Sequence, residues 1–97
     1  MLVVFSSTAR RDLIEIASFI ATDSPSRAKT FIDELAAACE GLSDQPERFA
    51  LIRGYEGKGY RSRPYGSYAI VYGVEQDHVR VLRVLHGARN LREIFGN

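Results

Sequence analysis

Residues 65–89 of this 97-residue chain read YGSYAIVYGVEQDHVRVLRVLHGAR and predict two long β-strands. The acidic run 75–77 between them suits a short hairpin loop. On the first strand, one face is expected to hold Tyr68, Ile70, Tyr72 and Val74, and the other Ala69 and Val71. On the second strand, one face is expected to hold Val79, Val81 and Leu85, and the other Leu82 and Val84. Because both faces are largely apolar, one helical layer cannot cover them, and we expect a partner to cover part of the remainder.

Two further segments lead into this hairpin from the N-terminal side. The alternating run 60–64, Tyr-Arg-Ser-Arg-Pro, predicts a strand that ends at Pro64, with Arg61 and Arg63 on the same side. A turn over residues 64–67 then connects it to the hairpin. The preceding connection, residues 44–59, is long for a small domain, and such loops are usually functional or mobile.

The first half of the chain predicts a short strand and two helices. Residues 2–6 form an apolar run of strand type that we expect to pair with the hairpin. Ser7 or Thr8 is expected to cap a helix that runs to about residue 22. Its apolar stripe comprises Ala9, Leu13, Ile16, Ala17 and Ile20, and Arg10, Arg11, Asp12 and Glu15 fill the opposite side.

A second helix follows almost at once. Ser24 is a good N-cap, and Pro25 suits the first helical position because it needs no hydrogen-bond partner there. The stripe of this helix comprises Ala28, Phe31, Ile32, Leu35, Cys39 and Leu42. With so short a link the two helices should form an antiparallel hairpin.

The order of elements therefore predicts an α+β fold in a single domain spanning residues 1–97. An N-terminal strand precedes an α-helical hairpin, and a three-stranded antiparallel meander follows, in the order β-α-α-β-β-β. Residues 88–95 are expected to form a short C-terminal helix or a tail.

Composition narrows the possible functions. The chain has one cysteine, Cys39, so an internal disulfide is impossible and a reducing cytoplasm is expected. The N-terminal apolar run is too short for a signal peptide or a membrane span. Residues 1–47 carry a net charge of −4 and residues 48–97 a net charge of +5, so the sheet half favours an acidic partner. Nothing in the sequence has the spacing of a metal site, a nucleotide-binding loop or a Ser-His-Asp triad, and no cofactor is expected.

Three segments in this order resemble the RelE/ParE toxin superfamily. They are the first helix (Ala9, Asp12, Leu13, Ile16 and Ile20), the stretch 59–72, and Arg83-Val-Leu-His-Gly-Ala-Arg89. The resemblance covers nearly the whole chain and is strongest to the ParE branch. It implies a toxin of a type II toxin–antitoxin system that inhibits DNA gyrase. A ParD-like antitoxin would neutralise it in a hetero-oligomer, and DNA would be contacted only indirectly, through the antitoxin.

The sister branch offers an alternative, because RelE-like proteins cleave messenger RNA in the ribosome. Such cleavage needs an acid, a base and cations beside the phosphate. Ala69 stands where that branch usually has Arg, and Gly87 and Ala88 stand where it usually has a Tyr or His pair. If the protein were a ribonuclease, its catalytic residues would be Arg61, Arg83, His86 and Arg89.

Without a convincing proton-transfer pair, we interpret the protein as a non-enzyme that acts by binding. His86 at a strand end more commonly bonds a neighbouring backbone group, and His78 is expected to be a solvated turn residue. The expected antitoxin-binding residues are Arg61, Arg63, Tyr68, Tyr72, Arg83 and Arg89, although tyrosines at strand spacing more often pack in a core. Residues 90–97 are a candidate gyrase contact by position only. A second alternative is a non-toxic module that only binds an antitoxin.

Overall fold

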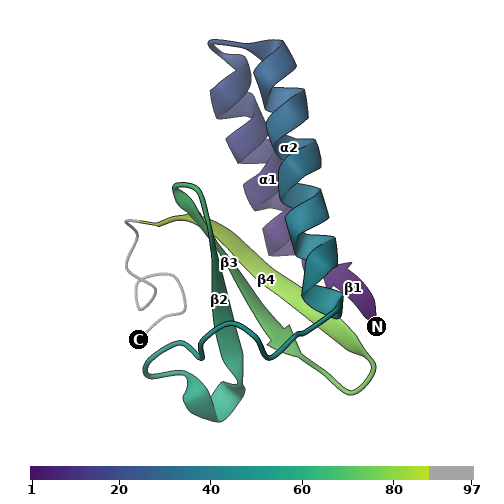
Figure 1. Ribbon diagram of the computed structural model, residues 1–97. Helices are drawn as coiled ribbons and strands as arrows, with labels where there is room; N and C mark the ends of the chain where they lie inside the picture. Colours follow the sequence, from purple (N-terminus) through teal and green to yellow (C-terminus); the bar gives the residue numbers. More distant parts are fainter. Residues whose placement is uncertain (88–97) are drawn as a thin grey trace.

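A computed structural model describes residues 1–87 of the chain (Figure 1). The helices are α1 (Ser7–Ala21) and α2 (Pro25–Glu40), and short 3-10 turns occupy Gly41–Ser43 and Glu56–Lys58. The strands are β1 (Leu2–Phe5), β2 (Tyr60–Tyr65), β3 (Tyr68–Val74) and β4 (His78–His86). They form one sheet in the order β1-β4-β3-β2. The predicted α+β arrangement is confirmed, and the expected C-terminal helix or tail lies outside the described residues.

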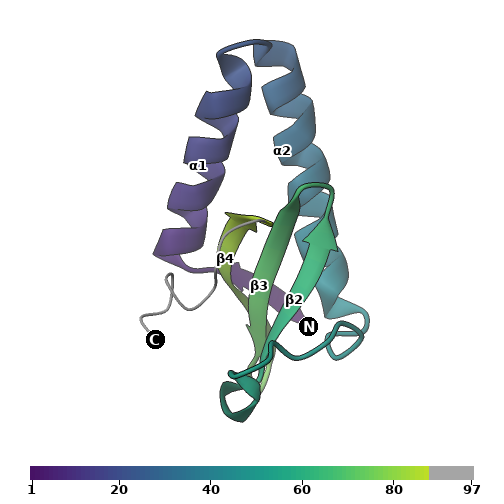
Figure 2. The same cartoon turned by 90° about the vertical axis from the view of Figure 1, so that its left-hand side faces the viewer.

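The N-terminal strand pairs with the hairpin, as predicted, and it does so in parallel with β4. The other strand pairs are antiparallel. The two helices lie side by side and antiparallel on one face of the sheet, and their connecting turn projects beyond its end (Figures 1 and 2). The outer part of the helical hairpin therefore has no sheet beneath it.

Local sequence explains where the helices begin. The Ser6 hydroxyl accepts a hydrogen bond from the Ala9 amide (3.0 Å), so α1 is capped one residue earlier than predicted. The Ser24 hydroxyl accepts from the Arg27 amide (3.2 Å), and Pro25 occupies the first turn of α2, which confirms the prediction for that helix.

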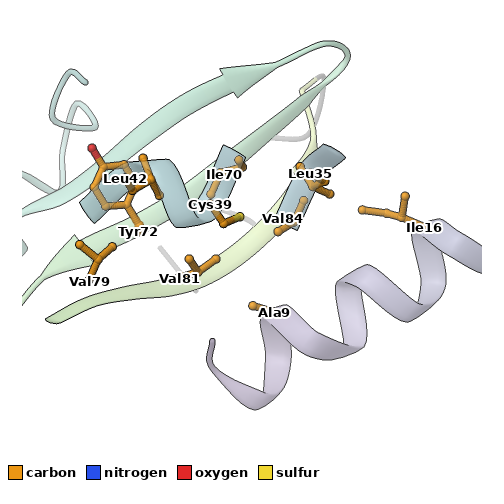
Figure 3. Packing of buried hydrophobic residues seen from close by; sticks show 10 residues of the cluster. All are labelled: Ala9, Ile16, Leu35, Cys39, Leu42, Ile70, Tyr72, Val79, Val81 and Val84. Atoms are coloured by element: carbon orange, nitrogen blue, oxygen red, sulfur yellow. The ribbon is translucent and has the colours of Figure 1, made fainter. Parts of the chain in front are cut away.

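The main core lies between the helical hairpin and the sheet (Figure 3). Its buried residues are Ala9, Ile16, Leu35, Cys39, Leu42, Ile70, Tyr72, Val79, Val81 and Val84. A smaller cluster of Ile52, Val71 and Leu85 lies apart from it, with Tyr55, Tyr60 and Leu82 packed against it. The sheet thus buries apolar side chains in two separate clusters, as its two apolar faces require.

A β-bulge corrects the predicted faces of β4. Tyr72 pairs with Val81, but Val71 pairs with Arg83, so Leu82 is an extra residue in the ladder. The alternation reverses after this point. Val84 therefore lies in the main core with Val79 and Val81, and Leu85 lies in the smaller cluster, whereas Leu85 was predicted to share the face of Val79 and Val81.

The connection 44–59 is fastened to the sheet at several points. The Tyr72 hydroxyl donates to the Pro46 carbonyl (2.7 Å), and the Ile52 amide donates to the Tyr60 carbonyl (2.8 Å). Leu51 forms an isolated antiparallel bridge with Arg61, and Ile52 is buried. This segment therefore protects the outer edge of β2, which would otherwise offer unpaired backbone groups.

Two smaller expectations about the turns are wrong. Pro64 does not end β2, because an edge strand tolerates a residue without an N–H, and Tyr65 still pairs with Tyr68. The tight turn is therefore Gly66-Ser67, with Gly66 at φ 57°.

The second expectation concerned His78 as a solvated turn residue. His78 is instead the first residue of β4, and its ring contacts the carboxylates of Glu75 (2.9 Å) and Asp77 (2.8 Å). The hydrogen bond from His78 lowers the pKa of Asp77.

Candidate functional site

Where β1 ends, the backbone groups at the edge of β4 are hydrogen-bonded by the N-cap residue of α1 and by a side chain of α1 instead of by a strand. β1 ends at Phe5, which pairs with Val81. The Ser6 amide then donates to the Val81 carbonyl (2.9 Å), and the Ser6 hydroxyl donates to the Leu82 carbonyl (2.9 Å). Further along, within α1, the Asp12 carboxylate accepts from the Val84 amide (2.9 Å). Ser6 and the Asp12 side chain thus complete backbone hydrogen bonds that a neighbouring strand would have made.

The same carboxylate holds Arg83. Nε and Nη2 of Arg83 donate to the two oxygens of Asp12 at 2.8 and 3.0 Å, a bidentate geometry. The side chains are only 19% and 9% exposed, and the hydrogen bond that Arg83 donates to Asp12 raises the pKa of Arg83. Asp12 was expected on the exposed side of α1. That expectation is wrong, because Asp12 is buried against β4.

Arg61 and Arg63 lie on β2 and both contact Phe49. Nη1 of Arg61 donates to the carbonyls of Phe49 (2.7 Å) and Glu47 (3.2 Å). The Arg63 guanidinium lies 5.2 Å from the centre of the Phe49 ring and 5.5 Å from that of Tyr65. Both side chains therefore help to hold the connection 44–59 in place.

The tyrosines divide between surface and core. Tyr68 is partly buried, with its ring 5.4 Å from that of Phe31 and 5.6 Å from that of His86. Tyr72 is fully buried, with its hydroxyl bonded to Pro46, and burial raises its pKa. The expectation that Tyr72 contacts a partner is corrected here, because its side chain has no exposed surface. Arg89 lies outside the described residues.

The residues named for RNA cleavage do not form one cluster in the described part of the chain. Arg83 is paired with Asp12, whereas Arg61 is bonded to backbone carbonyls of the connection 44–59. His86 is exposed and meets Tyr68 edge-on, and within residues 1–87 it forms no hydrogen bond to a second titratable side chain. Two of the three described candidates are thus occupied by different structural contacts.

Among the hollows that open beside the helices, two also reach the sheet. One, of about 210 Å³, lies between α1 and the ends of β3 and β4, and exposed Phe19 lines it. The other, of about 550 Å³, lies where the end of α2 meets the connection 44–59 and β2. Its lining includes Arg48, Phe49 and Arg63. Sequence reasoning named only Arg63 of these as a binding residue, because Arg48 and Phe49 lie in a segment without strand or helix periodicity.

Residues 1–87 contain neither a candidate metal site nor a candidate membrane-spanning helix. No cluster of three or more His, Cys, Asp or Glu side chains there is arranged to hold a metal ion. Neither described helix has the length and apolar character needed to cross a membrane.

Solved structures place this arrangement among proteins of toxin–antitoxin systems. One match is described as the chromosomal ParDE toxin–antitoxin system from P. aeruginosa, with 17% identity and a TM-score of 0.74 over 89% of this chain and 95% of that one. Another is the RelBE2 toxin–antitoxin complex from Mycobacterium tuberculosis, with 29% identity and a TM-score of 0.65 over 88% of this chain and 95% of that one. No curated protein sequence matches the chain.

The class of protein is therefore a type II toxin of the RelE/ParE superfamily. Over residues 3–91 the sequence matches the family described as the ParE toxin of the type II toxin–antitoxin system parDE. The chain belongs to this ParE toxin family.

Proposed function

We propose that this protein inhibits DNA gyrase by binding to it and that a ParD-like antitoxin neutralises it. The observation that carries the proposal is the match to the ParE toxin family over residues 3–91. Both partners would act in the cytoplasm, where gyrase meets its DNA. The protein itself would reach DNA only through the antitoxin.

The geometry of the charged residues favours binding over catalysis. Cleavage of RNA by attack of its 2′-OH needs an acid, a base and cations that are free to contact the phosphate. Arg83 is held by Asp12 and is 19% exposed, so its charge is already neutralised by a close carboxylate. Ala69, on the adjacent strand, brings no functional group at all. These contacts support a toxin that acts without chemistry of its own.

The antitoxin would bind through an acidic segment that is disordered when free and folds on the toxin. The smaller apolar cluster of the sheet is already partly covered by the connection 44–59, through Ile52 and Tyr55. The helical side offers more uncovered apolar surface, since Phe19 is 75% and Ile14 66% exposed. We therefore place much of the apolar contact along α1, with Tyr68 beside it and basic residues of the sheet half as charge partners.

The decisive experiment adds the purified protein to gyrase supercoiling and DNA-cleavage assays, with and without the antitoxin encoded beside it. We expect loss of supercoiling and accumulation of cleaved DNA, both reversed by the antitoxin. Pulse labelling after induction should show DNA synthesis stopping before protein synthesis. Codon-specific cleavage of ribosome-bound RNA with unaffected gyrase would contradict the proposal and support the RelE-like alternative. Normal growth and unaffected gyrase would support a non-toxic antitoxin-binding module.

A further inference from the structure

The cavity of about 550 Å³ at the end of α2 exists because the side chains on its helical wall are small. Ala37, Ala38 and Gly41 form that wall, and Gln45, Arg48, Phe49 and Arg63 line the rest together with Asp44. Larger side chains at these positions would fill the space between the end of α2 and the connection 44–59. The hollow thus combines a short aliphatic wall with a polar rim.

Two guanidinium groups are fixed at this cavity by a single ring. The Cζ atoms of Arg48 and Arg63 lie 5.3 and 5.2 Å from the centre of the Phe49 ring. Arg63 is further fixed by a hydrogen bond from Nη1 to the Pro64 carbonyl (2.8 Å). Stacking restricts both side chains before any ligand binds, and the hydrogen bond restricts Arg63 further, which lowers the entropy cost of binding a ligand.

Neither guanidinium is neutralised within residues 1–87. The ion pairs found there involve Arg27, Lys29, His78 and Arg83, not Arg48 or Arg63. Asp44 is the one acidic residue of the lining, and it is ion-paired with neither of them. The C-terminal end of α2 also disfavours an anion, but by less than one guanidinium at close range favours it. The cavity therefore keeps a local excess of positive charge.

We propose that this cavity binds a glutamate side chain from the acidic segment of the antitoxin. The inference rests on the proposed function and names one contact within it. The methylene groups of the glutamate pack on Ala37 and Ala38, and its carboxylate accepts hydrogen bonds from Arg48 and Arg63.

A peptide fits this cavity better than a nucleic acid does. Phe49 already contacts two guanidinium groups, so a base would have to compete with them for its ring. The Asp44 carboxylate at the rim repels a continuous phosphate backbone more than it repels a single carboxylate. A glutamate side chain has methylene groups that suit the aliphatic wall and one carboxylate that suits the two guanidinium groups.

The test measures binding of the antitoxin encoded beside the toxin, by calorimetry, to the intact protein and to single variants. Arg48→Ala and Arg63→Ala are each expected to raise Kd about tenfold, which corresponds to about 1.4 kcal/mol. Ala37→Phe, which fills the cavity, is expected to weaken binding similarly. Arg53→Ala is the matched control, because it removes one positive charge from the same connection without touching the cavity.

The glutamate itself is found by replacing each antitoxin glutamate with glutamine. One such replacement should lose its effect on Kd when Arg48 is already alanine, and that coupling identifies the pair. Arg63 also stacks on Phe49 and Tyr65, so its replacement can affect folding. The Kd of Arg63→Ala is therefore used only if this variant unfolds at the same temperature as the intact protein. If it does not, the test relies on Arg48→Ala, because Arg48 is exposed.

The outcomes separate this inference from the proposed function. Equal affinity for the intact protein, Arg48→Ala and Ala37→Phe overturns the glutamate site while leaving antitoxin neutralisation in place. Failure of the intact protein to bind the antitoxin overturns both. Tighter binding of a single-stranded oligonucleotide than of the antitoxin, lost in Arg48→Ala, also overturns the glutamate site and assigns the cavity to phosphate instead.

Discussion

Asp12 and Arg83 are 71 residues apart in sequence, yet their side chains form a bidentate ion pair that joins α1 to β4. The same carboxylate accepts from the Val84 amide, so one side chain satisfies both a guanidinium and a strand edge. Neither partner is more than 19% exposed. The relationship explains why an acidic residue lies buried in α1 beside an apolar core.

Replacing Asp12 with alanine should destabilise the protein by about 3 kcal/mol, because it leaves a mostly buried guanidinium and a buried amide without their acceptor. Asp12→Asn should cost less, since its amide oxygen can still accept from Val84. Urea unfolding measures both. Glu15→Ala, an exposed change one turn along α1, should stay within about 0.5 kcal/mol and serves as the control. Equal losses for Asp12 and Glu15 would show that the ion pair contributes nothing.

The helices were predictable because their determinants are local. Ser24 and Pro25 indicate where α2 begins. The four-residue spacing of Leu35 and Cys39 predicts its buried stripe from the helix sequence alone. The burial of Asp12 was not predictable in this way. Its partner comes from a distant strand, and within α1 it falls in the polar face.

The bulge at Leu82 shows the same limit for strands. Alternation predicts which face a side chain lies on only while the strand pairing is regular. The extra residue exchanged the faces on which Val84 and Leu85 lie. In the candidate site, Arg63 was identified from strand alternation. Arg48 was missed because its position depends on where the connection 44–59 lies against β2.

The hydroxyl of Tyr72 is expected to hold the start of that connection. Tyr72→Phe removes the donor to the Pro46 carbonyl and should cost about 1 to 2 kcal/mol, with faster amide exchange at residues 47–52. The control is Tyr68→Phe, whose hydroxyl has no hydrogen-bond partner within residues 1–87. Unchanged exchange in the Tyr72 variant would mean that the connection is held by its other contacts alone.

Cys39 should make the protein less stable at alkaline pH. Burial raises the pKa of its thiol from 9.0 to about 12, so the unfolded chain loses this proton at a lower pH than the folded one. The contribution is therefore intact below about pH 9 and is lost as the pH rises from there toward 12. Between pH 8 and pH 10 the loss should be about 1.4 kcal/mol.

Comparison with Cys39→Ala isolates this effect, because tyrosines such as Tyr72 also titrate in the same range. The variant will be less stable at pH 8, since it leaves a small cavity, but its stability should fall less by pH 10. Thiol-reactive dyes should also modify Cys39 only as fast as the protein unfolds. Parallel losses in both proteins would show that the thiol titrates normally in the fold.

His86 distinguishes the two modes of toxicity. It is exposed, and its described contact is an edge-on packing of its ring against Tyr68, so His86→Gln should leave folding intact. For a toxin that acts by binding gyrase, this variant should inhibit supercoiling within about threefold of the intact protein, a change below 1 kcal/mol. For a ribonuclease that uses His86 as acid or base, RNA cleavage should fall by about 10²-fold or more. The two mechanisms are compared by measuring gyrase inhibition, cleavage of ribosome-bound RNA and growth arrest for the same variant. If His86→Gln loses both growth arrest and RNA cleavage, the binding mechanism is rejected.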